Sequence, residues 1–114
     1  MSKNTQHFNS ADFRSQVIDS KVPVLVDFWA PWCGPCRVLG PAIDEVADKF
    51  EGRVIVGKVN VDENPDLGQA YQVRSIPTVL VFQDGAVVAQ LVGAQPASQY
   101  AAELEKALAN TPAS

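Results

Sequence analysis

The chain has 114 residues, of which 46% are hydrophobic and 19% are charged, and its formal net charge is -4. This length suits a single domain over residues 1–114 around one hydrophobic core, and we expect residues 110–114 to form a flexible tail. The composition is close to the globular average and excludes an intrinsically disordered chain. A mildly acidic chain with scattered Lys and Arg has no electrostatic basis for binding nucleic acid or an anionic membrane surface, so we expect neither partner.

Cysteine usage and the absence of apolar targeting segments indicate a cellular compartment. No apolar run reaches the roughly 18 to 20 residues of a membrane-spanning helix, and residues 1–9 lack the apolar region of a secretory signal. Both cysteines lie in one Cys-x-x-Cys, which cannot form the disulfide framework of a small secreted protein. We therefore expect a cytoplasmic protein, in which Cys-x-x-Cys is usually a metal half-site or a redox pair.

The first half of the chain predicts a helix, a buried strand and a second helix. Ser10 is placed to cap a first helix around residues 13–17. Residues 24–29 form an almost unbroken apolar run, which suits a central strand covered on both faces. Apolar side chains then recur at helical spacing over residues 39–50, where Pro41 predicts a kink.

The second half predicts two further strands, a short helix and a hairpin. Residues 54–61 form a second buried strand, and Asn64-Pro65 indicates the N-cap and first position of a helix that extends to about Tyr71. Residues 78–82 form a third strand. Asp84-Gly85 is a hairpin signal, so residues 87–92 should pair antiparallel with that strand.

A last helix begins at Pro96 and turns Tyr100, Leu104 and Leu108 inward. Strands that alternate with helices and close with a hairpin predict an α/β fold with a mixed sheet. The residues before Phe8 show only a weak pattern for an additional edge strand.

The cysteine pair is the main candidate for chemistry. Cys33 lies at the start of a helix, where free N–H groups and the helix dipole favour a thiolate, which is the nucleophilic form. The spacing lets the Cys36 sulfur lie one helical turn behind, so a small-ring disulfide can form and break. Pro35 stiffens the turn, and Gly34 leaves it open to a partner.

Three other roles for the pair remain as alternatives. A structural disulfide across so short a loop adds little stability in the chain-entropy model. A zinc site usually needs four ligands, and His7 is the only histidine, so we expect no metal. An inert pair in the core does not suit a Gly-Pro turn. A position between a strand and a helix favours the redox pair.

Four other residues have expectations of their own. Asp27 is either a solvated carboxylate or a buried one, and its apolar neighbours favour burial, which would raise its pKa and suit it to accept a proton from Cys36. Lys58 either favours the charged form of that carboxylate or lies exposed at a strand edge. Pro77 is expected to be trans from sequence physics, because only about 5–6% of X-Pro bonds are cis. Trp32 suits a partner surface.

Other residues carry no functional prediction. Trp29 suits core packing, and His7 suits an exposed surface position. Three acidic residues are expected to form a solvated stretch: Asp62, Glu63 and Asp66.

Residues 28–36, Phe-Trp-Ala-Pro-Trp-Cys-Gly-Pro-Cys, resemble the active-site segment of the thioredoxin family. The resemblance covers nearly the whole chain and includes further positions in order: Asp27, Pro41, Lys58, Ile76-Pro77-Thr78, Asp84-Gly85 and Gly93. It implies the thioredoxin fold, a central mixed sheet of about five strands flanked by four helices. Two positions depart from the common pattern, Arg37 where lysine is frequent and Gly40 where a better helix former is expected.

The resemblance also implies residue roles. Cys33 is the exposed nucleophile that attacks a substrate disulfide, and Cys36 is the shielded residue that resolves the mixed disulfide, so the two form the redox-active disulfide. Asp27 assists proton removal from Cys36, and Lys58 lies near that carboxylate. Pro77 is implied to be cis and to pack against the disulfide. The positions implied to contact the partner protein are Trp32, Ile76, Gly93 and Ala94.

We therefore expect a protein-disulfide reductase that acts as an electron carrier in cell redox homeostasis. The resemblance implies that electrons come from NADPH through a thioredoxin reductase, and that disulfide-containing proteins are the clients. The chain has neither G-x-G-x-x-G nor a phosphate loop, so we expect no bound cofactor, and we expect a monomer.

Two alternatives remain. A disulfide oxidase or isomerase usually carries a histidine between the cysteines, and Gly34-Pro35 has none. A binding subunit that uses the fold as a scaffold would keep its function after loss of both thiols.

Overall fold

A computed structural model of the chain describes residues 2–110, so the end of the expected tail, residues 111–114, lies outside the described residues. The elements in chain order are β1 (Thr5–Phe8), η1 (Arg14–Ile18), β2 (Val24–Trp29), α1 (Gly34–Lys49), β3 (Ile55–Asn60), α2 (Pro65–Ala70), β4 (Thr78–Gln83), β5 (Ala86–Val92) and α3 (Ala97–Ala109).

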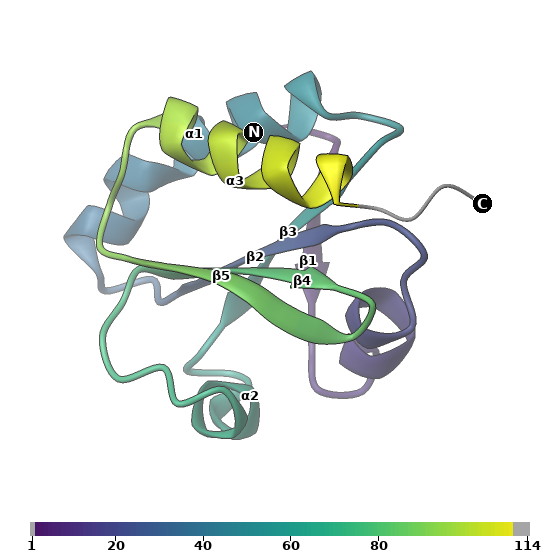
Figure 1. The fold of residues 1–114 in the computed structure, drawn as a ribbon. Helices are drawn as coiled ribbons and strands as arrows, with labels where there is room; N and C mark the ends of the chain where they lie inside the picture. The colour runs from purple at the N-terminus through teal and green to yellow at the C-terminus, as the bar shows by residue number, and fades with distance from the viewer. Residues whose placement is uncertain (1, 111–114) are drawn as a thin grey trace.

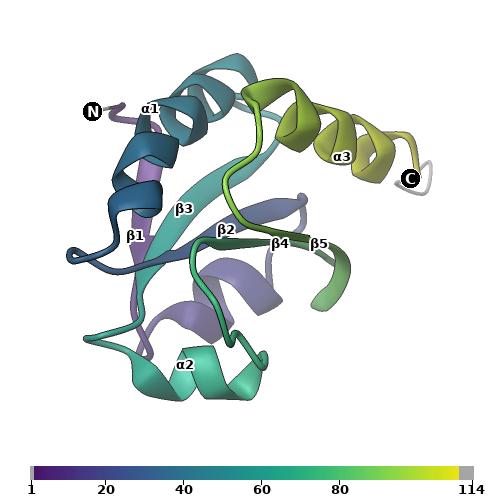
Figure 2. The same ribbon diagram turned by 90° about the vertical axis from the view of Figure 1, so that its left-hand side faces the viewer.

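The strands form one five-stranded sheet in the order β1-β3-β2-β4-β5. Strand β3 pairs parallel with both β1 and β2, whereas β4 pairs antiparallel with β2 and with β5. Helices α1 and α3 cover one face of the sheet, and η1 and α2 cover the other (Figures 1 and 2). The α/β fold with a five-stranded mixed sheet and four helices is confirmed.

The central strand β2 supplies side chains to both cores, which explains its apolar run. Leu25 belongs to the cluster that packs under α1 and α3, and Val24, Val26 and Phe28 belong to the cluster on the side of η1 and α2. Because side chains alternate along a strand, Asp27 points to the same face as Leu25. The carboxylate therefore lies beneath the α1 and α3 layer.

The predicted cap of the first helix is wrong. Segment η1 has Phe13 as its N-cap with no side-chain capping bond. Ser10 instead donates its hydroxyl to Asp66 at 2.6 Å, and its backbone N–H donates to the Asn64 side-chain oxygen at 3.0 Å. Asn64 is the N-cap residue of α2, as predicted, although its side chain binds Ser10 and the Asn60 carbonyl and makes no capping bond. Pro65 does open the helix as predicted.

The weak pattern near the N-terminus corresponds to a real edge strand. β1 pairs parallel with β3, and only its end residues Thr5 and Phe8 are buried. His7 is exposed, as expected. Pro41 lies inside α1 on its exposed side, and the kink expected there stays a prediction.

Candidate active site

The two cysteines lie where β2 gives way to α1, and they form a disulfide with a Cα–Cα distance of 5.3 Å. Cys33 is the N-cap of α1, and its sulfur accepts a hydrogen bond from the Cys36 backbone N–H at 3.2 Å. Pro35 occupies the first turn, where the missing N–H would have had no helical partner. The positive end of the helix dipole therefore faces the Cys33 sulfur, which favours a thiolate once the disulfide is reduced.

Burial does not separate the two cysteines in the way expected for an exposed Cys33 and a shielded Cys36. The exposed fraction is 5% for Cys33 and 3% for Cys36. Both pack with Ala30 and against Val61 and Ile76. In the disulfide form both residues are shielded from solvent. A difference in reactivity between Cys33 and Cys36 therefore has to come from their positions at the N-terminus of α1 and not from exposure.

The loop before β4 lies against the disulfide. The Ile76–Pro77 peptide bond is cis, as the family resemblance implied and against the trans expectation from sequence physics. The Ile76 carbonyl oxygen lies 3.8 Å from the Cys33 sulfur. The Pro77 carbonyl accepts a hydrogen bond from the Gly93 N–H at 2.8 Å, which joins this loop to the end of β5.

Asp27 is buried, with 1% of its surface exposed, and neither carboxylate oxygen has a hydrogen-bond partner among the described residues. Burial raises the pKa of Asp27 from 3.8 to about 7, and the positive charge of Lys58 opposes part of that rise. A carboxyl group with this pKa exchanges protons near neutral pH. The solvated alternative for Asp27 is excluded.

Lys58 pairs in register with Asp27 on the neighbouring strand β3. It is half-buried on an internal strand, so the exposed-edge alternative is wrong. Its ammonium nitrogen lies 5.9 Å from the centroid of the Trp29 ring, and 3.6 Å from the place where a Cβ on Gly40 would lie. The lysine stem thus reaches from the sheet to α1, and the glycine leaves room beside it.

Trp32 is 67% exposed, yet its ring is held in place. Its indole N–H donates to the Asp62 carboxylate, with 2.9 Å to the nearer oxygen. Asp62 is exposed, as expected of the acidic stretch, but it also accepts this hydrogen bond, and no sequence signal links it to Trp32 across 30 positions. Asp62 is in turn positioned by its backbone N–H, which donates to the Asn60 side chain at 2.9 Å.

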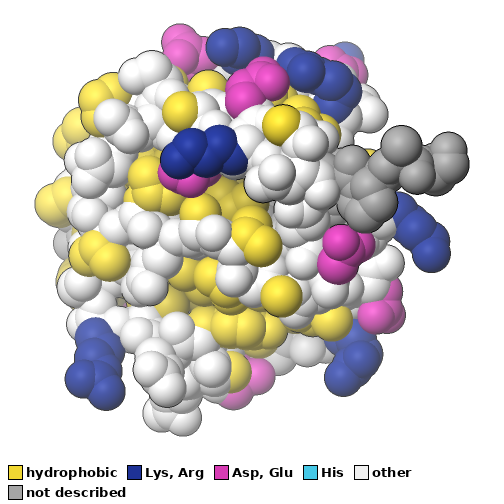
Figure 3. Space-filling model, in the orientation of Figure 1, with side chains coloured by type: hydrophobic (Ala, Val, Ile, Leu, Met, Phe, Trp, Pro, Cys, Tyr) yellow, Lys and Arg dark blue, Asp and Glu magenta, His cyan; other side chains and the backbone are white. Residues whose placement is uncertain are grey.

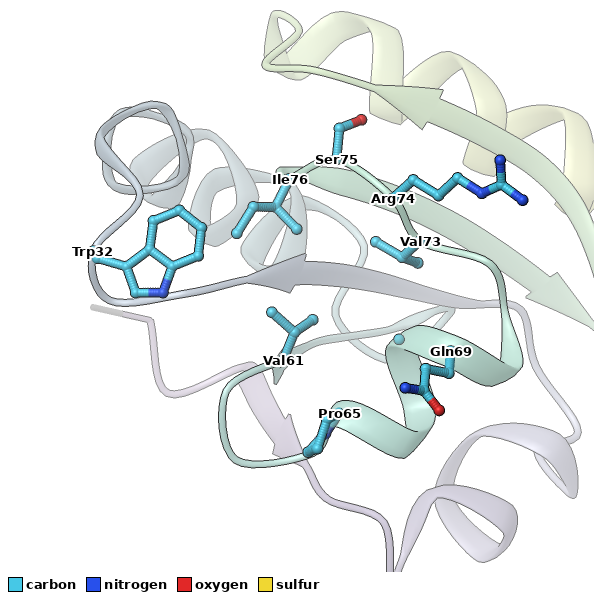
Figure 4. Close-up of a pocket in the computed structure, with 9 residues that line it drawn as sticks. Trp32, Val61, Pro65, Gln69, Val73, Arg74, Ser75 and Ile76 are labelled. Carbon is cyan, nitrogen blue, oxygen red and sulfur yellow. The ribbon is translucent and has the colours of Figure 1, made fainter.

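Beside the disulfide lies a mostly apolar groove of about 290 Å³. Trp32 and Ile76 form its end nearest the cysteines, and Val61 lies between them and α2 (Figure 4). The remaining lining residues come from α2 and the loop that follows it: Pro65, Gly68, Gln69, Val73, Arg74 and Ser75.

Two further predicted partner residues follow β5. Gly93 is half-buried with a φ of 84°, in the left-handed region that favours glycine, and Ala94 is exposed. Hydrophobic side chains also gather around β5, between α3 and α2, on the face shown in Figure 3. Val87, Val88 and Val92 of that strand are exposed.

Within residues 2–110 no group of three or more His, Cys, Asp or Glu side chains is arranged to hold a metal ion. In the same residues no helix has both the length and the apolar character needed to cross a bilayer.

Comparison with known proteins gives one family. A sequence model of the family described as Thioredoxin matches residues 4–106. A thioredoxin of Synechocystis sp. is 50% identical over 104 residues, which cover 91% of this chain and 97% of the relative. Thioredoxin 1 of Nostoc sp. is 53% identical over 84% of this chain and 90% of the relative. A thioredoxin of Haemophilus influenzae is 52% identical over 83% of this chain and 89% of the relative.

Proposed function

The chain belongs to the thioredoxin family and is a protein-disulfide oxidoreductase, and we propose that Cys33 is its nucleophile and Cys36 its resolving residue. The Cys33 thiolate attacks one sulfur of a client disulfide, and the other client sulfur leaves as a thiolate. The Cys36 thiolate then attacks the Cys33 sulfur and expels the second client sulfur. Two electrons pass to the client, which takes up two protons, and the Cys33–Cys36 disulfide forms.

The hydrogen bond from the Cys36 N–H to the Cys33 sulfur carries this assignment of roles. A sulfur that accepts a backbone N–H at a helix N-terminus has a stabilised anion, so reduction of the disulfide favours a thiolate on Cys33. Cys36 lies inside the first turn of α1 and is the residue that has to lose a proton during the second attack.

We propose that Asp27 accepts the proton that Cys36 loses. Its raised pKa of about 7 supports the assignment, because a carboxylate that ionises near neutral pH can accept a thiol proton directly or through water. Lys58 supports the ionised form from the neighbouring strand.

The client segment is proposed to bind at the mouth of the apolar groove. Trp32 and Ile76 would contact it from one side, and Gly93 and Ala94 from the other. Gly34 and Pro35 shape the turn between the two sulfurs and leave the disulfide accessible to a client. Pro77 fixes the loop that lies against Cys33.

Thioredoxins need no bound cofactor, and their clients are proteins that contain disulfides. We further propose that this chain is a monomer that works in the cytoplasm, where its own disulfide is reduced by a thioredoxin reductase with electrons from NADPH. A reducing compartment suits a chain whose only cysteines are the redox pair.

The proposal is tested by trapping the mixed disulfide. Cys36→Ser leaves the nucleophile but removes the resolving thiol, so insulin should remain covalently attached to the protein after acid quenching and thiol blocking. Cys33→Ser is the matched control and should trap nothing. Equal trapping by both variants, or by neither, would contradict the assigned roles.

A further inference from the structure

Tyr100 is a fully buried residue of α3 that the proposed chemistry does not use. Its hydroxyl oxygen accepts a hydrogen bond from the Gln95 backbone N–H at 3.1 Å. The same hydroxyl donates to the Gly93 backbone carbonyl, with 3.4 Å between the oxygens. One phenol therefore binds both a donor and an acceptor of the loop that joins β5 to α3.

This loop is connected to the reactive disulfide. Gly93 donates its N–H to the Pro77 carbonyl at 2.8 Å. The adjoining Ile76 carbonyl lies 3.8 Å from the Cys33 sulfur. The loop that the Tyr100 hydroxyl holds is therefore joined to the cis-proline turn beside the disulfide, where a client has to bind.

The loop has few other restraints among the described residues. Gln95 makes one side-chain bond, to the Val92 carbonyl at 3.3 Å. Ala94, between the two residues that bind the phenol, is exposed. Without the hydroxyl, one half-buried N–H and one half-buried carbonyl would lose their partner, which disfavours the present loop conformation. Burial raises the pKa of Tyr100, so the hydroxyl keeps its proton at neutral pH and can donate to Gly93.

We propose that Tyr100 is a positioning residue for client recognition. Its hydroxyl holds residues 93–95 in the conformation that receives a client polypeptide, and so sets the affinity for protein disulfides without changing the reactivity of the cysteine pair. This inference rests on the proposed function, in which Gly93 and Ala94 contact the client.

The test removes only the oxygen atom. Tyr100→Phe should raise the KM for insulin by about fivefold and leave kcat near the parent value, because an interaction that orders a binding loop acts on substrate binding. Its reaction with a small disulfide, 5,5′-dithiobis(2-nitrobenzoate), and its reduction potential should match those of the parent. Tyr71→Phe is the matched control, because the Tyr71 ring packs with Phe13 and Phe82 and its hydroxyl has no hydrogen-bond partner in residues 2–110.

Hydrogen exchange separates this role from a general loss of stability. In Tyr100→Phe the Gln95 amide should exchange about tenfold faster, since the hydroxyl that accepts its N–H is gone, while amides in the middle of β2 keep the parent rate. An unchanged KM for insulin would overturn the proposal. Equal losses with insulin and the small disulfide would overturn it as well, because they would indicate a structural role. If the parent itself failed to reduce insulin, the proposed function would fail instead.

Discussion

Asp27 is the residue whose surroundings differ most from those that a carboxylate normally has. Its apolar neighbours in the sequence predicted burial, but the completeness of that burial depends on α1 and α3 closing over β2. The spacing of residues along the sequence does not predict how completely the helices cover Asp27. It also does not predict that neither carboxylate oxygen has a hydrogen-bond partner among the described residues. The pKa of about 7 is therefore a property of the assembled fold.

This pKa makes the stability of the disulfide form depend on pH. Between pH 4 and pH 7 the native state holds a proton on Asp27 that the unfolded state has released, so the free energy of unfolding should fall as pH rises through this window. A shift of about 3 pKa units, at about 1.36 kcal/mol each, gives a fall on the order of 4 kcal/mol.

Asp27→Ala should abolish most of that fall, because the group with the raised pKa is gone. Urea unfolding of parent and variant from pH 4 to pH 8 measures it. The cavity left by the truncation lowers stability at every pH, so the slope with pH is the informative quantity. The same slope in both proteins would contradict the raised pKa.

Asp27→Asn should slow turnover of insulin by about tenfold near pH 7.5, because an amide of the same shape cannot accept the Cys36 proton. The rate of the parent should rise as Asp27 ionises around pH 7, and the variant should lack that rise. A pH–rate profile of the variant that coincides with the parent profile would remove Asp27 from the proton transfer.

The bond between Trp32 and Asp62 gives a prediction about client binding. Asp62→Ala should raise the KM for insulin by about threefold, because the exposed indole would lose the acceptor that holds it at the groove. Asp62→Asn keeps an acceptor oxygen and should stay close to the parent. Equal KM values in all three proteins would show that the indole needs no such anchor.

At the scale of elements, most strands and helices follow from local pattern. The hairpin between β4 and β5 was predictable from Asp84-Gly85, and both residues adopt the positive φ that this turn requires. Ser10 was misassigned because its partners lie far along the chain, 54 and 56 positions away. A local capping rule cannot detect such competition.

Substitution of two glycines by alanine tests how α1 and β3 pack against their neighbours. A Cβ on Gly40 of α1 would meet only the Lys58 ammonium, at 3.6 Å. Gly40→Ala should therefore raise the free energy of unfolding by about 0.5–1 kcal/mol through helix propensity. A Cβ on Gly57 of β3 would lie 2.7 Å from the Phe8 ring atom Cζ and 3.0 Å from the Gln6 carbonyl oxygen.

Gly57→Ala should consequently lower the free energy of unfolding by about 1–3 kcal/mol, because the ring and the β1 backbone have to move. Urea unfolding of both variants beside the parent gives the comparison. A stability loss in Gly40→Ala as large as that in Gly57→Ala would contradict the described packing of Lys58 against α1.

At the scale of the whole molecule, the sheet order brings the site together. The start of α1 and the turn before β4 meet at the disulfide, although Cys33 and Ile76 are 43 positions apart, and the loop after β5 bonds to that turn through Gly93. The motif alone predicted a redox pair. The contribution of Pro77 and Gly93 came only from the resemblance, because neither residue has a local pattern that marks it as part of a site.

The central claim, that Cys33 begins the attack, is tested most directly by the rate at which Cys33→Ser reduces insulin disulfides with dithiothreitol as electron donor. The parent should accelerate this reaction. The variant should be slower than the parent by about 100-fold or more, since the remaining thiol, Cys36, lies inside the first turn of α1 and lacks the backbone N–H hydrogen bond that the Cys33 sulfur accepts. A rate for Cys33→Ser close to that of the parent would contradict the account.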